Sequence, residues 1–257
     1  MKTVYGPVSS WRLGRSLGVD LICSKEKICS FDCLYCQLGK TVKTTVNRKK
    51  FVSIKKMKTE IIEALKETTP DVITFSGTGE PTIVNNMELA IETIRKISNI
   101  PLAVLTNSSL MNKADVRNTI SKLDIVVAKL DAPNEKIFKI INQPDDNITF
   151  KENIEGIKKF KEMFSGKLAL QIMFMSDNIQ YADDIVKLVK NIGPDEVQIN
   201  TPLRISPVKP LTKKQLELIE KKFKIHSMNT ISVYTSKKPK TRPLDKMELI
   251  NRRRMEV

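Results

Sequence analysis

The sequence predicts an α/β protein: a partial (β/α)6 barrel with a short N-terminal extension and a basic C-terminal extension. Six short apolar runs alternate with amphipathic stretches, which implies a parallel sheet with right-handed crossovers. The chain has 257 residues. The roughly 200 residues that carry the pattern suit six strand–helix units and are too few for a full eight-unit barrel. We therefore expect an N-terminal extension over residues 1–17, the barrel over 18–210, and a C-terminal helix, strand and basic tail over 211–257.

The expected strands are rich in Val, Ile and Leu without strict alternation, as is typical of strands buried on both faces. They cover residues 18–23, 71–76, 102–106, 125–130, 168–175 and 196–201. The first of these runs places Cys23 in a strand, as a buried residue; the alternatives are a thiol on the substrate side or an alternative ligand.

The stretches between the strands repeat apolar residues three and four positions apart, for example Ile154, Ile157 and Phe160. This spacing puts the apolar side chains on one face of a helix, which can then pack on the sheet. Asn178 and Thr212 are residue types that begin helices, and each precedes such a stretch.

The composition excludes several classes of protein. Hydrophobic residues make up 40% of the chain and charged residues 28%, which allows a sizeable core and excludes wholesale disorder. The single histidine, His226, excludes sites built from several histidines and leaves little for Ser-His-Asp machinery. The apolar runs are too short to cross a bilayer, and the first ten residues lack the apolar centre of a secretion signal. We expect a soluble, cytoplasmic protein.

All four cysteines fall within fourteen residues, at Cys23, Cys29, Cys33 and Cys36. Such a cluster indicates metal or redox chemistry. The last three form a CxxxCxxC run, and thiolates at close spacing can hold three irons of a [4Fe–4S] cluster while the fourth iron stays open to a small chelating molecule. Zinc and a disulfide are the alternatives. Zinc sites with four cysteines usually consist of two separated CxxC pairs, which this spacing does not form.

The CxxxCxxC run, with Tyr35 just before its last cysteine, resembles the signature of the radical S-adenosylmethionine (SAM) enzymes. In that family a glycine-rich turn with a Glu follows the second strand and binds the methionyl amino group of SAM. Residues 74–81, TFSGTGEP, resemble this turn. The resemblance implies a radical SAM barrel, a [4Fe–4S] cluster on the three cysteines, and SAM binding by Tyr35, Gly77, Gly79 and Glu80. Glycines would let the backbone approach the ligand closely.

The chain also resembles single-cluster relatives of the tRNA wyosine synthases, an Fe–S oxidoreductase group. Residues 5–20, 129–132 and 197–201 carry this likeness, and the whole resemblance covers residues 4–205. True wyosine synthases hold a second cluster on additional cysteines, and Cys23 is the only cysteine left over. Wyosine synthesis itself is therefore not implied.

Polar residues at the carboxyl ends of the expected strands are candidates for the site, because barrel enzymes do their chemistry there. We expect Asn107 and Gln171 to bind SAM, and Lys129, Asp131 and Asn200 to be catalytic. Lys129 and Asp131 lie two positions apart and share one face of a strand. The alternative for this pair is a buried ion pair without catalytic function.

The charge of +15 is concentrated in two segments. Residues 40–58 hold eight basic residues and no acidic ones, a charge of +8, and residues 237–257 hold eight basic and three acidic ones, a charge of +5. Together they carry +13. Solvated surface is one explanation, but this concentration favours a polyanionic partner.

We therefore expect a radical SAM enzyme that cleaves SAM to a 5′-deoxyadenosyl radical and abstracts hydrogen, with a nucleoside in tRNA as the leading substrate. RNA would bind through segments 40–58 and 237–257, and ferredoxin or flavodoxin would supply low-potential electrons. One alternative is an activase or a peptide- or protein-modifying radical SAM enzyme. The other is an iron–sulfur RNA-binding module without enzymatic activity.

Overall fold

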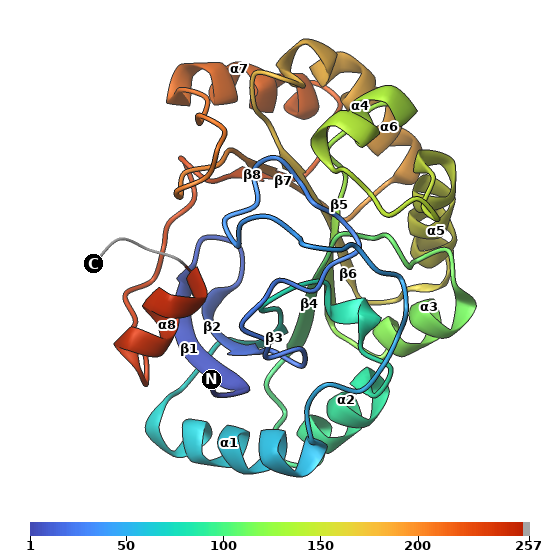
Figure 1. Cartoon of the computed structure of the whole chain (residues 1–257). Helices are drawn as coiled ribbons and strands as arrows, with labels where there is room; N and C mark the ends of the chain where they lie inside the picture. Colours follow the sequence, from blue (N-terminus) through green and yellow to red (C-terminus); the bar gives the residue numbers. More distant parts are fainter. Residues whose placement is uncertain (254–257) are drawn as a thin grey trace.

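The structure, a computed structural model, describes residues 1–253. Its core is one eight-stranded sheet in the order β1-β2-β3-β4-β5-β6-β7-β8, curled into a half barrel with the helices outside (Figure 1). β1 pairs with β2 antiparallel, and all later neighbours are parallel. The strands are β1 (Val4–Ser10), β2 (Gly14–Val19), β3 (Val72–Phe75), β4 (Leu102–Thr106), β5 (Ile125–Lys129), β6 (Lys167–Met173), β7 (Glu196–Asn200) and β8 (Thr230–Ser232).

The helices follow the strands in alternation, which confirms the partial barrel with six strand–helix units. They are α1 (Ile54–Glu67), α2 (Met87–Arg95), α3 (Ala114–Ile120), α4 (Glu135–Ile141), α5 (Phe150–Met163), α6 (Ala182–Ile192), α7 (Lys213–Lys224) and α8 (Lys246–Arg253), with short 3-10 turns at Pro81–Ile83 and Ile179–Tyr181. None of the helices within residues 1–253 is long and apolar enough to cross a membrane.

Side-chain hydrogen bonds at the helix starts explain why several helices begin where they do. Thr149 and Thr212 each form a capping box with the residue three positions later, at the starts of α5 and α7. Thr212 is thus confirmed as a helix start. Asn178 precedes a 3-10 turn instead, and its side chain accepts the N–H of Met175 at 2.8 Å.

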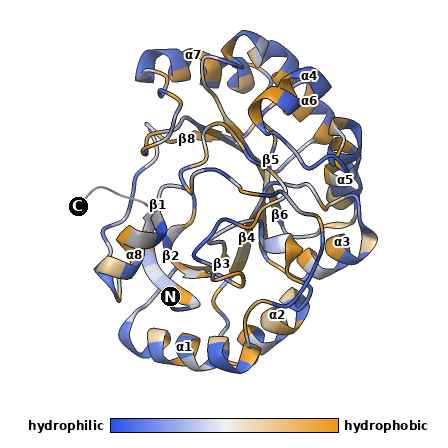
Figure 2. Cartoon of the chain, in the orientation of Figure 1, coloured by the Kyte–Doolittle hydropathy of each residue, from blue (hydrophilic) through white to orange (hydrophobic). Residues whose placement is uncertain are grey.

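The two faces of the sheet differ in polarity. One face packs against the helices through apolar side chains such as Leu170 and Ile199, and the helices turn their hydrophobic sides inward (Figure 2). Because side chains alternate along a strand, the other face, inside the barrel, carries Lys129, Gln171 and Gln198. The interior is therefore polar where the strands approach their carboxyl ends.

The N-terminal region differs from the expectation. The first parallel strand is β2, Gly14–Val19, and not residues 18–23, and β1 adds an antiparallel edge strand before it. The boundary expected after residue 17 falls inside β2. Cys23 lies in the loop after β2, with φ of 49°, so its placement in a buried strand was wrong. Residues 18–23, GVDLIC, are apolar enough to suggest a strand, but the chain turns at Asp20, whose carboxylate accepts the N–H groups of Ile22 and Cys23.

Candidate active site

The cysteine loop, residues 20–53, connects β2 to α1 and crosses the face of the barrel seen in Figure 1. It carries Cys29, Cys33 and Cys36. The loop leaves the carboxyl end of β2, and the loops that follow the other parallel strands start at the same end of the barrel. The three cysteines therefore lie at the end where barrel enzymes place their chemistry.

The start of the cysteine run lies directly on the glycine-rich turn of residues 77–80. The N–H of Ile28 donates to the carbonyl of Thr78, and the N–H of Glu80 donates to the carbonyl of Ile28, both at 3.1 Å. A Cβ atom at Gly79 would lie 1.6 Å from the Ile28 oxygen. Gly79 is thus required by a contact inside the chain, in addition to any approach of a ligand.

The next part of the cysteine run is anchored on the segment that follows α4. The N–H of Asp32 donates to the carbonyl of Gln143 at 2.9 Å. The ring of Phe31 meets the ring of Phe138 edge-on, with 5.3 Å between centroids. These contacts hold a loop without regular structure on two elements of the barrel.

Two amide side chains donate to cysteine sulfurs. Nδ2 of Asn107 lies 3.6 Å from Sγ of Cys29 and 2.8 Å from the hydroxyl of Ser30. Nδ2 of Asn142 lies 3.6 Å from Sγ of Cys33. Hydrogen bonds to the sulfurs stabilise thiolate ligands and tune an iron–sulfur cluster. Asn107, expected to bind SAM, is therefore placed beside the cluster ligands.

Burial in the loop disfavours free thiolates at two of the cysteines. Burial raises the pKa of the Cys33 thiol to about 11 and also raises the pKa of the Cys29 thiol. Thiolates at these positions need positive charge, which a metal supplies. Burial alone would lower the pKa of Lys27. The negative charge of Cys36 and Cys29 and the hydrogen bond to Asp32 raise the pKa by more, so the ammonium stays charged.

Asp131 ties the cysteine loop to the end of β5. Its side chain is fully buried and pairs with Lys129 at 3.2 Å. It accepts the Tyr35 hydroxyl, the amide of Asn142 at 2.9 Å and the N–H of Met173 at 2.8 Å. The Lys129 ammonium also lies over the Tyr35 ring, 4.6 Å from its centroid. Lys129 and Asp131 are therefore an ion pair that holds the tyrosine of the cysteine loop.

Glu80 is also held by the chain. It is 2% exposed, and its carboxylate accepts the hydroxyl and N–H of Thr82, the hydroxyl of Thr106 and the N–H of Asn107. Burial raises its pKa, although these donors oppose the shift. The carboxylate thus shapes the turn of residues 77–80 and joins it to the end of β4.

The donor set fits a cluster better than the alternatives. All four cysteines are free thiols, so no disulfide forms. Among residues 1–253, no three His, Cys, Asp or Glu side chains converge closely enough for a single metal ion. Ligands of a [4Fe–4S] cluster bind different irons and stand farther apart than the ligands of one ion. Three thiolates with amide donors at two of them suit such a cluster.

The remaining candidates lie deeper or farther along the barrel. Gln171 is the register partner of Lys129 on one side and of Gln198 on the other. Asn200 lies on β7, and its side chain accepts the N–H of the adjacent Thr201 at 2.9 Å. The structure therefore joins Gln171 to the Lys129 pair by register, and it leaves Asn200 outside the network of the cysteine loop.

Several residues of the site were missed. Lys27 and Asn142 lie outside the motifs, Asp20 is only the last residue of the stretch 5–20 that carries the family likeness, and the roles of all three depend on contacts with distant segments. Asp20 alone had a usable signal, because it is an acidic residue directly after an apolar strand. Placing the strand four residues too late hid it.

Comparison with known proteins supports the same assignment. A model of the radical SAM superfamily matches residues 27–200. A UPF0026 protein of Methanocaldococcus jannaschii is 36% identical over 228 residues, covering 86% of this chain and 70% of that protein. A UPF0026 protein of Synechocystis is 38% identical over 209 residues, covering 80% and 77%. A Brachyspira hyodysenteriae protein named GTPase Obg is 35% identical over 260 residues, and the chain spans 38% of its length.

Solved structures show the same fold. Streptococcus suis SuiB bound to precursor peptide SuiA has a TM-score of 0.65 at 14% identity, covering 86% of this chain and 49% of that chain. A radical SAM methyltransferase from Sphaerobacter thermophilus has a TM-score of 0.64 at 13% identity, covering 84% and 65%. Archaeal TYW1 has a TM-score of 0.52 at 13% identity, covering 80% and 70%. At these identities the likeness concerns the fold alone.

Two of these relatives carry the UPF0026 name and none is named a wyosine synthase, so the resemblance to the wyosine synthases stays a prediction. The family match spans the cysteine run, the glycine-rich turn and the strands up to β7. The chain belongs to the radical SAM superfamily of enzymes, within the UPF0026 family, and its cofactors are a [4Fe–4S] cluster and SAM.

Proposed function

We propose that this chain cleaves SAM reductively and modifies a nucleoside in RNA, most simply tRNA. The chemistry that the bound cofactors would supply is reductive cleavage of SAM to methionine and a 5′-deoxyadenosyl radical, which would abstract hydrogen from the substrate. A low-potential donor such as ferredoxin or flavodoxin would supply the electron. The chain's own part is to bind and orient both cofactors and to exclude water from the barrel.

The roles of individual residues follow from their contacts. Cys29, Cys33 and Cys36 would hold the cluster, and the turn of residues 77–80 would take the methionyl end of SAM. Asp131 acts through Tyr35 and Lys129, so we assign it a positioning role. Lys129 and Asn200 stay our candidates for contact with the reacting groups.

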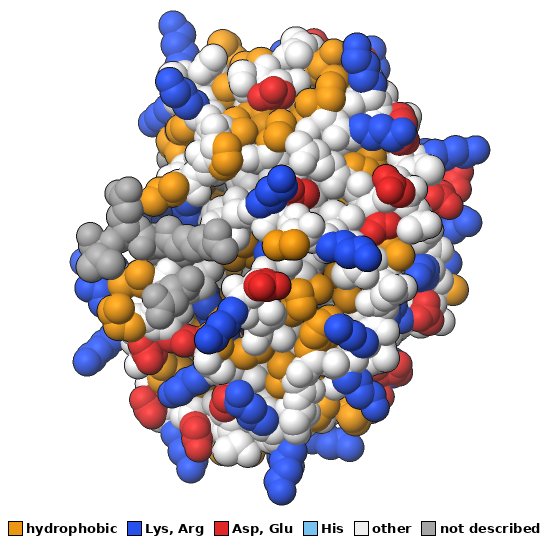
Figure 3. Space-filling view, in the orientation of Figure 1, with side chains coloured by type: hydrophobic (Ala, Val, Ile, Leu, Met, Phe, Trp, Pro, Cys, Tyr) orange, Lys and Arg blue, Asp and Glu red, His pale blue; other side chains and the backbone are white. Residues whose placement is uncertain are grey.

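The observation that carries the RNA proposal is the exposed charge of the cysteine loop and the start of α1. Seven lysines of segment 40–58 are exposed, at Lys40, Lys43, Lys49, Lys50, Lys55, Lys56 and Lys58. The first lies four residues after Cys36. Figure 3 shows Lys and Arg side chains spread over the face seen in Figure 1. Positive charge so close to the radical source suits a phosphate-bearing substrate.

Arg48 is used differently from these lysines. Its guanidinium donates to the carbonyl of Thr82 at 3.0 Å and pairs with Asp115. It therefore pins the cysteine loop to the chain after the glycine-rich turn and to the start of α3. A variant designed to test RNA binding has to leave Arg48 intact.

The test is tRNA binding by the protein with intact cofactors, measured against salt. Phosphate contacts release counterions, so the affinity should fall with a log–log slope of about −0.7 to −0.9 per contact. From about 50 to about 200 mM salt, five or more contacts should weaken binding roughly a hundredfold. Replacing Lys43, Lys49 and Lys50 by Gln should flatten the slope by about two units.

A matched control removes the same charge elsewhere. Lys151, Lys158 and Lys159 are exposed on α5, in the outer helix layer. Their replacement by Gln should leave the salt slope unchanged. The RNA proposal fails if the wild-type protein binds no tRNA at low salt, or if both triple variants change the slope equally. A peptide or protein substrate then takes its place.

A further inference from the structure

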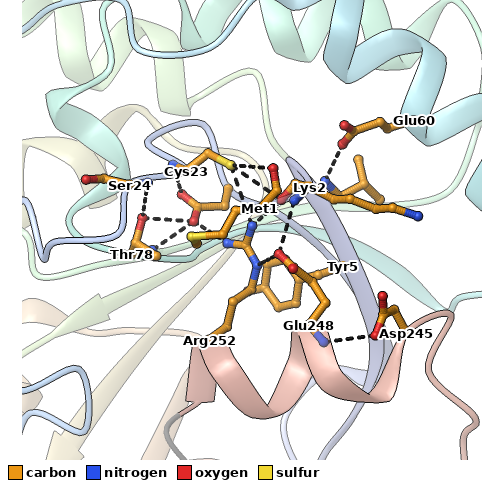
Figure 4. A network of polar contacts seen from close by, with 12 residues as sticks. Met1, Lys2, Tyr5, Cys23, Ser24, Glu60, Thr78, Asp245, Glu248 and Arg252 are labelled. Atoms are coloured by element: carbon orange, nitrogen blue, oxygen red, sulfur yellow. Dashed lines mark hydrogen bonds and ion pairs between the residues drawn. The ribbon is translucent and has the colours of Figure 1, made fainter.

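The C-terminal helix α8 buries one guanidinium, that of Arg252. Its side chain is 3% exposed, whereas Lys240, Arg242 and Lys246 of the same basic segment are exposed. Figure 4 shows Arg252 reaching from α8 into a network of polar contacts beside β1. This arginine is therefore unavailable to a polyanion, and its charge is used inside the chain.

Arg252 is held on every side. It pairs with Asp20 and with Glu248, the latter at 3.0 Å. It donates to the carbonyl of Lys2, and its guanidinium lies 4.7 Å from the centroid of the Tyr5 ring. A buried arginine is stable only when it is paired and hydrogen-bonded in this way.

Asp20, the partner of Arg252, lies at the carboxyl end of β2 and is 2% exposed. Its carboxylate accepts the N–H groups of Ile22 at 3.0 Å and Cys23 at 2.8 Å. It also accepts the N–H of Thr78 at 3.1 Å and the Thr78 hydroxyl at 2.9 Å. Asp20 thus connects Arg252 with the middle of the glycine-rich turn.

The turn is packed closely against Asp20. A Cβ atom at Gly77 would lie 2.1 Å from Cγ of Asp20. The Thr78 hydroxyl also accepts the N–H of Ser24 at 3.1 Å. The backbone carbonyl of Thr78 accepts the N–H of Ile28. A shift of the Asp20 carboxylate would therefore move both the turn and the chain that leads to the cysteine run.

We propose that Arg252 is a positioning residue, which holds Asp20 so that the turn of residues 77–80 keeps the shape that receives the methionyl end of SAM. The proposal rests on the assignment of this turn to SAM in our proposed function. It does not depend on the identity of the substrate. It couples a helix at the end of the described chain to a turn more than 170 residues earlier.

A purely structural role would make Arg252 the anchor of α8, but the segment has other anchors. The N–H of Leu244 donates to the carbonyl of Gly6 at 2.6 Å, and the Ser9 hydroxyl donates to the carbonyl of Pro239 at 2.5 Å. These bonds to β1 do not involve Arg252. Removing its guanidinium should therefore leave the segment in place while it releases Asp20.

The test compares Arg252→Gln with Arg242→Gln, a control that removes the same charge from an exposed side chain of the same segment. Iron content, SAM affinity by equilibrium dialysis, and the change that SAM causes in the EPR spectrum of the reduced cluster are measured without RNA. We expect Arg252→Gln to keep its iron and to bind SAM about tenfold more weakly, as for one lost charged hydrogen bond. Its SAM-induced EPR change should also differ from wild type, and Arg242→Gln should match wild type throughout.

Two further variants keep the result interpretable if Arg252→Gln folds poorly. Arg252→Lys keeps the charge near Asp20 without the planar fork and should recover part of the affinity. Thr78→Val removes the hydroxyl that bonds Asp20 and does not touch α8. Thr78→Val should weaken SAM binding and keep the iron. The double variant with Thr78→Val and Arg252→Lys should weaken SAM binding by less than the product of the two single effects, because both act through Asp20.

Wild-type SAM affinity and an unchanged EPR response in a folded Arg252→Gln would overturn the proposal. Fully multiplicative effects of Thr78→Val and Arg252→Lys would do so as well. Because no arm of the experiment uses RNA, a failure here is separate from a failure of tRNA binding.

Discussion

The carboxyl ends of strands β2–β5 and the inward faces of β6 and β7 use their polar side chains differently. At β2–β5, the carboxylates of Asp20, Glu80 and Asp131 each accept several donors of the chain itself. In the middle of β7, Oε1 of Gln198 has no hydrogen-bond partner within residues 1–253 although the residue is 1% exposed, and in the other group only the buried Oδ1 of Asn142, beside the cysteine loop, is left in the same way. For Gln171, which is also buried, the described chain provides no side-chain hydrogen bond.

The barrel therefore has two parts with different polar contacts. We call the ends of β2–β5 the cofactor half and β6 and β7 the substrate half. Buried polar groups are normally paired, and an unpaired one needs an explanation such as a ligand or a water. The half that carries the cysteine loop and the glycine-rich turn is already ordered by its own carboxylates, so we expect it to receive the cluster and SAM with little rearrangement. We expect Gln198, with its register partner Gln171, to serve the substrate.

The largest expected effect tests the cofactor half at its centre. Replacing Cys29, Cys33 or Cys36 by Ala should abolish the brown chromophore and SAM cleavage, because in our proposal each thiolate would hold a different iron. Iron content and the visible absorption spectrum after anaerobic reconstitution measure this.

Cys23→Ala is the matched control for the cluster. The Cys23 sulfur lies 3.5 Å from the carbonyl of Lys2 and 3.6 Å from the Arg252 guanidinium, so it belongs to the network beside β1. The variant should keep most of its iron. Equal loss of iron in all four variants would contradict the assignment of the open iron.

The next effect concerns Gly79. If Gly79 served only the close approach of the ligand to the backbone, Gly79→Val would weaken SAM binding and spare the cluster. The structure changes that expectation, because a side chain would displace the Ile28 carbonyl at the start of the cysteine run. Gly79→Val should therefore lower iron content and SAM affinity together. Gly193→Asn, in open space with left-handed backbone that Asn tolerates, should change neither. Full iron content in Gly79→Val would show that the loop does not depend on this contact.

A smaller effect is expected at Asp131. Breaking a buried ion pair by neutralising one partner costs about 3–5 kcal/mol of unfolding free energy. Asp131→Asn should lower the melting temperature of the protein by roughly 6–20 °C at about 2–4 °C per kcal/mol. Asp184→Asn, which removes an exposed charge paired with Lys187 on α6, should change it by less than about 2 °C. Equal melting temperatures for both variants would show that the Tyr35 anchor contributes little.

The smallest effect on the protein itself tests the substrate half. Gln198→Leu removes an oxygen that has no partner and one bond to Glu196 at 2.8 Å. We expect a change in unfolding free energy of about 1 kcal/mol or less and unchanged SAM affinity. Turnover on the substrate should show a rise in KM of about fivefold or more, as for a lost hydrogen bond. If SAM affinity falls instead, Gln198 belongs to the cofactor half and the two regions are not divided as we describe.

Much of the barrel was predictable because its signal is local. The strands expected at residues 102–106 and 196–201 match β4 and β7 within one residue, since buried parallel strands are continuous apolar runs. The edge was not predictable in this way. β1 has no such run, and β2 ends at Val19, where Asp20 turns the chain and is bonded to distant Thr78.

By itself the sequence determined the chemistry of this protein, through the spacing of Cys29, Cys33 and Cys36 and the glycine-rich turn about forty residues later. It also determined the alternation of strands and helices, because periodicity and cysteine spacing are properties of neighbouring residues. Only the tertiary structure decided that Gly79 accommodates Ile28, and that Arg252 is buried against Asp20 while the lysines of segment 40–58 stay exposed. Those outcomes depend on pairs of residues that are far apart in the chain, and charge or size read along a sequence does not reveal which distant partner will pack against them.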